Sequence, residues 1–320
     1  MVGLGACSRG RRLHVFNWSD YVAAGTIPGF EREAGVVVRY GQYESAEEMM
    51  ARVLSGNSGW DVVFPSNALV PPMRQLGLLA PLDHRRLPGL HHLDPVFQSP
   101  PWDPGLQWSV PYMWGATGIA YQQSLQLPLR RWADLWSPAL AGRVTLLDDP
   151  AEVFAACLKR RGHSLNTAEP RALEQARDDA VALKRHLRGF LNAEARDQLV
   201  AGELLAAQAW RLTARQAMEG APGRLAFIYP EEGFPVYADC AAILKESRRT
   251  ELAHQFLEYL LRPEVAAEIA REMKTATCNR SAQERLGQRE PVPAGGEWFE
   301  PLDAANQRYR DRLWTEIKAA

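Results

Sequence analysis

Short apolar runs alternate with longer stretches of helical periodicity along most of this chain, and this alternation restricts the folds that it can adopt. Strands are predicted at residues 13–16, 36–40, 60–64, 143–147, 204–209, 225–229 and 241–244. Helices are predicted at residues 27–34, 44–54, 150–161, 168–187, 213–218, 251–261 and 263–272. Strands that alternate with helices are typical of an α/β protein.

Composition narrows the class of protein further. The 320 residues are enough for two domains, and a hydrophobic content of 46% allows a real core. The net charge is only −1, with Lys and Arg scattered, so nucleic acid is not an expected partner. No apolar run approaches the roughly 20 residues that span a bilayer.

The four cysteines show no spacing that is typical of a metal site, so no metal and no cofactor is predicted. Three of them lie in apolar stretches and are expected to be buried thiols: Cys157, Cys240 and Cys278. Cys7 follows small residues, as in a bacterial lipoprotein processing site, which would tether the protein outside the cytoplasm. The preceding residues lack the basic and apolar regions of a full signal, so lipidation and a chance match both stay open.

Polar and aromatic residues gather where the predicted strands end. These segments are residues 17–21 (NWSDY), 65–67 (PSN), 148–152 (DDPAE) and Trp210. Ligands of open α/β sheets bind beyond the carboxyl ends of the strands. Carboxylates beside aromatic faces suit a cation, through charge-assisted hydrogen bonds and cation–π contacts.

Each of these features also has a purely structural interpretation. Asp149 and Glu152 have the spacing of a helix N-cap and its third-position acid. Capping and ligand binding are compatible, because a side chain at a helix start can lie at the edge of a cleft. Residues 19–20 could cap a helix that begins at residue 21, and Trp18 and Trp210 could be core residues. Asp239 lies among apolar residues and needs a cationic partner, water or a cap, because an unpaired buried carboxylate is costly.

No catalytic motif is visible, so the chain is not expected to be an enzyme. It lacks GxSxG, HExxH, Walker and GxGxxG sequences. Asp149 and Glu152 are too close along one helix start to flank a glycosidic bond. Cys240, beside Asp239, is the single candidate nucleophile for an enzymatic alternative.

Six segments in order resemble the spermidine/putrescine-binding proteins of bacterial ABC importers. They are residues 17–21 (NWSDY), 43–45 (YES), 62–66 (VVFPS), 110–117 (VPYMWGAT), 148–154 (DDPAEVF) and 256–266 (FLEYLLRPEVA). The resemblance implies a type II periplasmic-binding-protein fold, with two lobes of mixed sheet and helices around a ligand cleft. Residues 1–12 are expected to be an N-terminal tether or a signal remnant. The resemblance implies one lobe at 13–114 plus 238–283 and the other at 115–237 plus 284–320.

The resemblance also implies a role for each residue of one lobe's ligand site. Trp18 and Tyr21 would wall the methylene chain of a polyamine, either putrescine or spermidine. Ser19, Asp20 and Ser66 would face one amine.

In the other part of the site, Asp149 and Glu152 would hold a second ammonium group. Trp210 and Tyr237 would provide aromatic walls, and Asp239 would pair with a nitrogen. The expected partners are an ABC permease and its ATPase subunits, and the protein is expected to be a periplasmic or cell-surface monomer.

Three departures from the family leave the exact amine open. They are Ala68 and Thr275, where relatives often have an aromatic residue, and Phe299, where a polar amide can occur. A rival hypothesis is a protein of the same fold for another cationic or amino-acid-like solute. An anion-binding protein would need a basic residue at the site, and Arg211, next to Trp210, is the candidate for that role.

Overall fold

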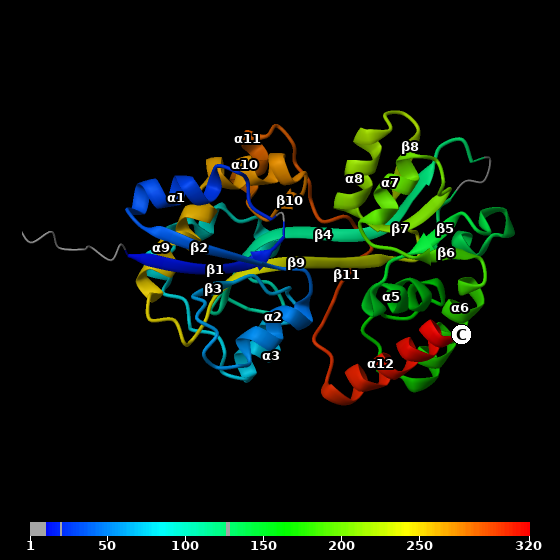
Figure 1. Ribbon diagram of the computed structural model, residues 1–320, viewed down its shortest axis with the longest axis horizontal. Helices are drawn as coiled ribbons and strands as arrows, with labels where there is room; N and C mark the ends of the chain where they lie inside the picture. The colour runs from blue at the N-terminus through cyan, green and yellow to red at the C-terminus, as the bar shows by residue number, and fades with distance from the viewer. Residues whose placement is uncertain (1–10, 20, 126–128) are drawn as a thin grey trace, which may run out of the picture. The chain divides into compact units, whose positions relative to one another are not determined.

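The computed structural model describes residues 11–19, 21–125 and 129–320, which form an α/β fold of two compact units. Unit 1 comprises Met1–Met113 and Ala238–Glu290, and unit 2 comprises Trp114–Tyr237 and Pro291–Ala320. The chain therefore passes between the units after residues 113, 237 and 290, where the sequence suggested 114, 237 and 283. The long strands β4 (Ser109–Gln122) and β9 (Phe234–Ile243) each continue from one unit into the other (Figure 1).

Unit 1 is built on a mixed sheet in the order β2-β1-β3-β9. In this sheet β1 is Arg12–Trp18, β2 is Val37–Tyr43 and β3 is Val62–Val63. The short strand β10 (Ala276–Thr277) pairs with β4. β1 is parallel to β2 and β3, and β9 is antiparallel to β3. The helices are α1 (Thr26–Ala34), α2 (Ala46–Val53), α3 (Val70–Gln75), α4 (Pro95–Gln98), α9 (Thr250–Leu261), α10 (Pro263–Met273) and α11 (Arg280–Arg285).

Local signals in the sequence set the ends of several unit 1 helices. α1 ends at Gly35, whose φ of 63° is left-handed backbone that glycine adopts without strain. α2 begins after Ser45, whose Oγ accepts a hydrogen bond from the Glu48 N–H at 3.1 Å. α10 begins at Pro263, as predicted for a proline at the first helical position.

Unit 2 has a sheet in which β4 lies between antiparallel neighbours β7 (Ala206–Trp210) and β8 (Leu225–Ile228). β5 (Val144–Leu146) is parallel to both β6 (Leu187–Phe190) and β7, and β11 (Gly296–Trp298) is parallel to β9. The helices are α5 (Pro150–Arg160), α6 (Pro170–Lys184), α7 (Glu194–Val200), α8 (Arg211–Gly220) and α12 (Ala304–Ala319).

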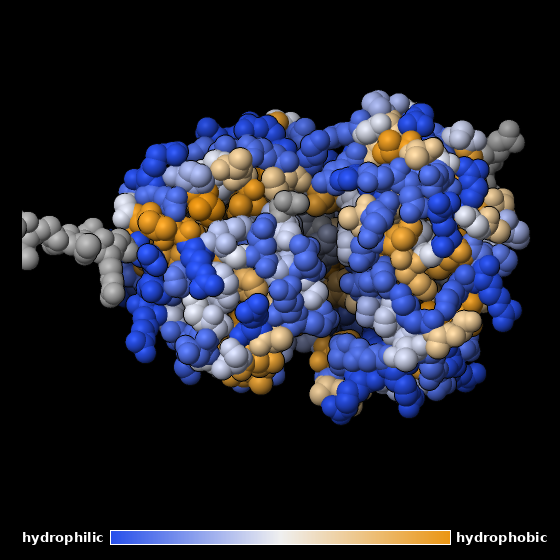
Figure 2. Space-filling view, in the orientation of Figure 1, coloured by the Kyte–Doolittle hydropathy of each residue, from blue (hydrophilic) through white to orange (hydrophobic). Residues whose placement is uncertain are grey.

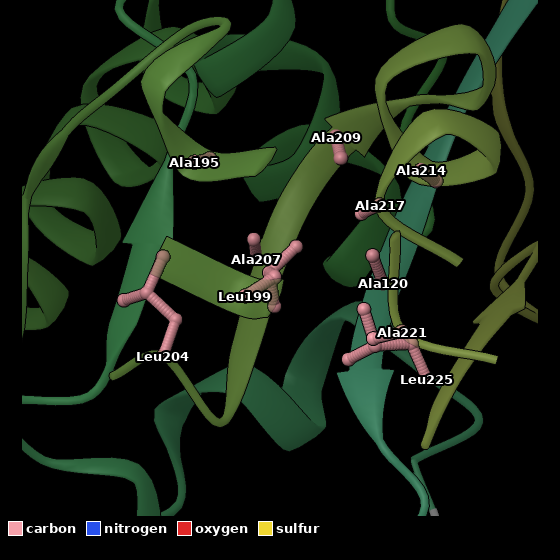
Figure 3. Packing of buried hydrophobic residues seen from close by; sticks show 10 residues of the cluster. All are labelled: Ala120, Ala195, Leu199, Leu204, Ala207, Ala209, Ala214, Ala217, Ala221 and Leu225. Atoms are coloured by element: carbon pink, nitrogen blue, oxygen red, sulfur yellow. The ribbon is translucent and has the colours of Figure 1, made fainter. Parts of the chain in front are cut away.

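An alanine-rich cluster fills the space between this sheet and helices α7 and α8. Figure 3 shows its buried side chains, among them Ala120, Leu199, Ala207 and Ala214. Small side chains allow the helices to approach the sheet closely, and the close packing fixes β7 against β4. β7, whose last residue is the predicted site residue Trp210, forms one side of this cluster.

The structure corrects several details of the sequence-based prediction. β1 extends to Trp18, two residues beyond the strand end predicted at residue 16. No helix begins at residue 21, because α1 starts at Thr26, so Ser19 caps no helix there. The helix predicted to reach residue 187 ends at Lys184, and Leu187 begins β6. β4 and α12 were not predicted.

The face in Figure 2 is largely hydrophilic with apolar areas between the polar ones, and a few large apolar side chains are exposed. In the described part of the chain these are Val37, Leu54, Leu76 and Val96. No helix among the described residues is both long enough and apolar enough to span a bilayer.

Candidate functional site

Asp239 is the central acid of the candidate site in unit 1. It lies on β9, is 6% exposed, and its Oδ2 accepts a hydrogen bond from the Tyr21 hydroxyl at 2.5 Å. The backbone of Asp239 forms an isolated antiparallel bridge with Ser66. Burial raises the pKa of the Asp239 carboxyl to about 7, although the Tyr21 hydrogen bond opposes the shift. Three predicted residues are thus brought together.

Tyr21 and Trp18 are held by hydrogen bonds within unit 1. The Tyr112 hydroxyl donates to the Tyr21 carbonyl oxygen at 2.7 Å. Trp18 Nε1 donates to the Phe64 carbonyl oxygen at 2.9 Å, and the Tyr43 hydroxyl donates to the same oxygen at 2.6 Å. Trp18 is only partly buried, so it is not one of the core residues, and its ring packs against Tyr43 with the two ring centroids 4.6 Å apart.

Ser19 makes a contact that was not expected. The Ser19 hydroxyl donates to Glu44 Oε1 at 2.5 Å, so its proton is already engaged by an acid of the YES segment. Asp20 and Cys7 lie outside the described residues. Ser19 can therefore contact an amine only by accepting a hydrogen bond on its oxygen. Glu44 adds a carboxylate that was not among the predicted site residues.

Glu152 is the central acid of the candidate site in unit 2. It lies in the first turn of α5 and is 3% exposed. Its Oε1 accepts hydrogen bonds from the Thr117 hydroxyl at 2.9 Å and from Trp210 Nε1 at 3.0 Å. Its Oε2 is buried and has no hydrogen-bond partner among the described residues. Burial, followed by the negative charge of Asp149, raises the pKa of the Glu152 carboxyl to about 8.

Asp149 performs the capping role that the sequence indicated. Its Oδ1 accepts a hydrogen bond from the Glu152 N–H at 3.1 Å, and Pro150 occupies the first helical position. Asp149 is half-exposed, so capping does not remove its side chain from solvent. The cap places two carboxyl groups at one end of α5.

Trp210 and Tyr237 approach the same face of β4. Trp210 is opposite Thr117 in the β7–β4 register. A Cβ atom at Gly115 would lie 2.4 Å from Tyr237 Cζ, so the Tyr237 ring rests directly on the backbone of Gly115 and a larger residue there would displace it. Residues 115 and 117 point to one face of the strand, because side chains alternate along it. Glu152, Trp210 and Tyr237 therefore gather around this face, and Asp149 is next to Glu152 at the start of α5.

The chemistry of the two halves suits a cation. No Lys or Arg in the described part of the chain pairs with Glu152 or Asp239, so neither acid is neutralised by a guanidinium or ammonium group. A buried carboxyl without a counter-charge favours an incoming cation that can hydrogen-bond to it. No group of three or more potential metal ligands occurs among the described residues.

The enzymatic alternative gains no support from Cys240. Its side chain is buried, and burial raises the pKa of the thiol far above its ordinary value. The thiolate, which is the nucleophilic form, is therefore disfavoured. Cys157 and Cys278 are also buried, as predicted.

Sequence reasoning missed three residues that shape the site: Thr117, Gln208 and Glu44. Thr117 ends the VPYMWGAT segment, but it was not selected because β4 itself was not predicted. Gln208 is two residues before Trp210 and so points to the same face of β7. That spacing was the available signal, and it required the strand to be assigned through Trp210.

The chain is similar to known binding proteins over almost its whole length. The family model described as bacterial extracellular solute-binding protein matches residues 27–294. A spermidine/putrescine-binding periplasmic protein of Salmonella typhimurium is 35% identical over 280 residues, which are 86% of this chain and 79% of that protein. Its counterpart from Escherichia coli K12 is 32% identical over 326 residues, covering 96% of this chain and 91% of the relative.

A solved structure shares the fold. It is the substrate-binding protein of a spermidine/putrescine ABC transporter from Streptococcus pneumoniae, with a TM-score of 0.84 and 25% identity, covering 97% of this chain and 99% of that one. The match of the family model to most of the residues, together with relatives above 30% identity, establishes the family. This chain belongs to the bacterial extracellular solute-binding proteins.

Proposed function

We propose that this protein is the substrate-binding subunit of an ABC importer and captures a polyamine, with putrescine and spermidine as the first candidates. The observation that carries the proposal is Glu152: a buried carboxyl whose Oε2 lacks a partner among the described residues, beside the indole of Trp210. Such a group gains most from a ligand that supplies both a positive charge and an N–H donor. The names of the relatives support the same solute class.

In this proposal the two units each bind one part of the amine. In unit 1, Asp239 accepts one ammonium group, with Trp18 and Tyr21 against the methylene chain and Ser66 beside the acid. Asp20 completes this half. The Tyr21 hydroxyl would share Asp239 with the ligand, because the carboxylate has acceptor capacity beyond the one bond that Tyr21 makes.

In unit 2, Asp149 and Glu152 accept a second ammonium group, and Trp210 and Tyr237 provide aromatic faces. A ligand that binds both units stabilises the closed arrangement of the lobes, because only that arrangement allows both sets of contacts. The chain then presents a ligand-dependent form to its permease.

The strengths of these contacts are sufficient for specific binding. Charge-assisted hydrogen bonds contribute about 1.5–3 kcal/mol each. Desolvated cation–π contacts add about 0.5–2 kcal/mol each. Two or three such hydrogen bonds and two cation–π contacts contribute roughly 4–13 kcal/mol before the ordering cost of association is subtracted. Micromolar affinity corresponds to about 8 kcal/mol and therefore requires contacts near the strong end of these ranges.

Other parts of the proposal concern the cellular setting. The protein acts outside the cytoplasm as a monomer, with a permease and its ATPase subunits as partners, and without catalysis. The names of the relatives place them in the periplasm, which supports this location. Lipid attachment at Cys7 is tested by mass spectrometry of the mature protein from a native host.

A thermal-shift panel tests the solute class. Putrescine, spermidine, spermine, amino acids and sugars are compared at equal concentration, with titration calorimetry on the best ligand. Ligand at 100 times its Kd stabilises the folded protein by about 2.7 kcal/mol, so the preferred ligand gives the largest shift. Stabilisation by polyamines alone is expected, and a sugar or a carboxylate as the best ligand would overturn the proposal.

A further inference from the structure

Gln208 makes two hydrogen bonds that fasten the segment carrying both acids of unit 2. It is fully buried on β7, its Oε1 accepts from the Leu147 N–H at 3.2 Å, and its Nε2 donates to the Glu152 carbonyl oxygen at 2.8 Å. The orientation of the amide follows from its partners, because a flipped amide would face donor to donor and acceptor to acceptor.

These two bonds lie on either side of Asp149. β5 ends at Leu146, so the Leu147 N–H lies beyond the strand and finds its partner in Gln208. Glu152 is in the first turn of α5. Gln208 therefore connects the end of the strand to the start of the helix and limits the movement of the turn between them.

The same strand also fixes the carboxyl group of Glu152. Gln208 and Trp210 point to one face of β7, since side chains alternate along a strand. Gln208 holds the backbone of Glu152, while Trp210 and its register partner Thr117 both donate to Oε1. With Oε1 occupied twice, Oε2 is the oxygen left for a ligand.

We infer that Gln208 is a positioning residue for amine recognition: it touches no ligand, and it sets where Glu152 presents its vacant oxygen. The inference rests on the proposed function. An ammonium group needs an acceptor within about 0.5 Å of the right position, and a helix start held at only one end does not provide that precision.

Gln122 provides a matched control in the same unit. It lies on β4, is 7% exposed, and its Nε2 donates to the carbonyl oxygens of Leu199 and Leu204 at 2.7 and 3.2 Å. Like Gln208, it is a buried glutamine that joins two backbone groups. Its partners belong to the alanine-rich cluster of Figure 3, and none is a predicted site residue.

The test compares Gln208→Met with Gln122→Met, because methionine keeps the length of the side chain and removes its amide. Calorimetric titration with putrescine is expected to show at least a tenfold loss of affinity in Q208M and less than a twofold change in Q122M. Both variants lose a similar amount of thermal stability. Equal affinity in Q208M and the wild type would overturn the inference.

A double-mutant comparison separates positioning from general destabilisation. In an E152Q background, Q208M is expected to weaken putrescine binding less than threefold, because the charged acceptor that Gln208 positions is already absent. A full tenfold loss in that background would overturn the inference. Q208N, whose shorter amide reaches only one partner, replaces Q208M if that variant does not fold.

These variants distinguish a failure of the proposed function from a failure of the role proposed for Gln208. If the wild type binds no amine, or if E152Q binds putrescine as tightly as the wild type, the proposed function fails and the positioning role fails with it. If E152Q weakens binding while Q208M does not, the proposed function stands and the role of Gln208 is refuted.

Discussion

At the residue scale, Glu152 and Asp239 are buried carboxyl groups that can each accept a hydrogen bond from a ligand. Burial raises the pKa of both carboxyl groups, so ligand binding is expected to depend on pH. The pKa of Glu152 is raised to about 8 by burial and by the nearby charge of Asp149. The groups that face it from β4 and β7 are the neutral Thr117 and Trp210. At neutral pH a large part of the Glu152 population is therefore protonated, and an ammonium ligand must displace that proton.

Amine affinity is accordingly expected to rise with pH between about 6 and 8.5. Binding of a cation favours the ionised carboxyl, so putrescine binding releases protons in this range. Calorimetric titrations in buffers of different ionisation enthalpy measure the number of protons released. In E152Q the release is expected to fall by about one half or more, with Asp239 as the remaining source. A pH-independent affinity in the wild type would contradict the role of Glu152.

The same group makes a stability prediction of defined sign. A carboxyl whose pKa is higher in the folded than in the unfolded protein stabilises the fold fully below the unfolded value, near 4.5, and less as pH rises to the folded value, about 8. E152Q is therefore expected to gain stability relative to the wild type over this range, at up to about 1.4 kcal/mol per pH unit. Denaturant unfolding at pH 5 and 8 measures the difference, and no change between the two would refute it.

Asp239 is the corresponding acid of unit 1. Changing Asp239 to Asn keeps an acceptor for the Tyr21 hydroxyl but removes the charge. The variant is expected to bind putrescine at least tenfold more weakly, because a charge-assisted bond becomes a neutral one. Y21F is the control: it removes one hydrogen bond to the acid and leaves its charge. Unchanged affinity of D239N in a calorimetric titration would remove Asp239 from the site.

At the element scale, Asp149 has two functions at the start of α5, and two substitutions can separate them. Asp149 caps the helix through its Oδ1 and also brings a second negative charge to Glu152. Asparagine caps helices about as well as aspartate, whereas alanine does not. D149N is expected to keep the stability of the wild type and lose amine affinity about tenfold. D149A is expected to lose about 1 kcal/mol of stability as well. Thermal unfolding and calorimetry measure the two effects, and normal binding by D149N would leave Asp149 with the capping role alone.

Elements with strong local signals were predicted closely, and those fixed by long-range contacts were not. Gly35, Pro150 and Pro263 mark helix ends by their own backbone preferences, and these ends were found, whereas the cap at Ser45 lies inside the helix predicted at residues 44–54. β4 was missed because nearly all its residues are buried, so it shows no alternation of polar and apolar side chains.

α12 was missed because it is a highly charged helix with few apolar positions. Only Arg310, Leu313 and Ile317 are buried along it, and one of these is an arginine. For the site, residue types at strand ends could be predicted, but the pairing of Thr117 with Trp210 could not, since it depends on the register of two strands. The two hydrogen bonds by which Gln208 connects Leu147 and Glu152 were missed for the same reason.

On the scale of the whole molecule, the proposal requires one ligand to engage acids in both units. β4 and β9 each run from one unit into the other, so a change in the arrangement of the units must pass through a small number of strands. A ligand with two ammonium groups then gains twice from one binding event. The second contact is intramolecular and does not carry another loss of translational freedom.

A comparison of putrescine with butylamine tests this requirement, since the two share a four-carbon chain and differ in one ammonium group. In the wild type, putrescine is expected to bind at least 100-fold more tightly. Small-angle X-ray scattering is expected to show a smaller radius of gyration with putrescine and little change with butylamine. In D239N or E152Q the affinity ratio should fall at least tenfold, because the second ammonium no longer meets a carboxylate, whereas Q122M should keep it. A ratio near one in the wild type would mean that a single unit binds the amine, and that closure around a bridging ligand does not occur.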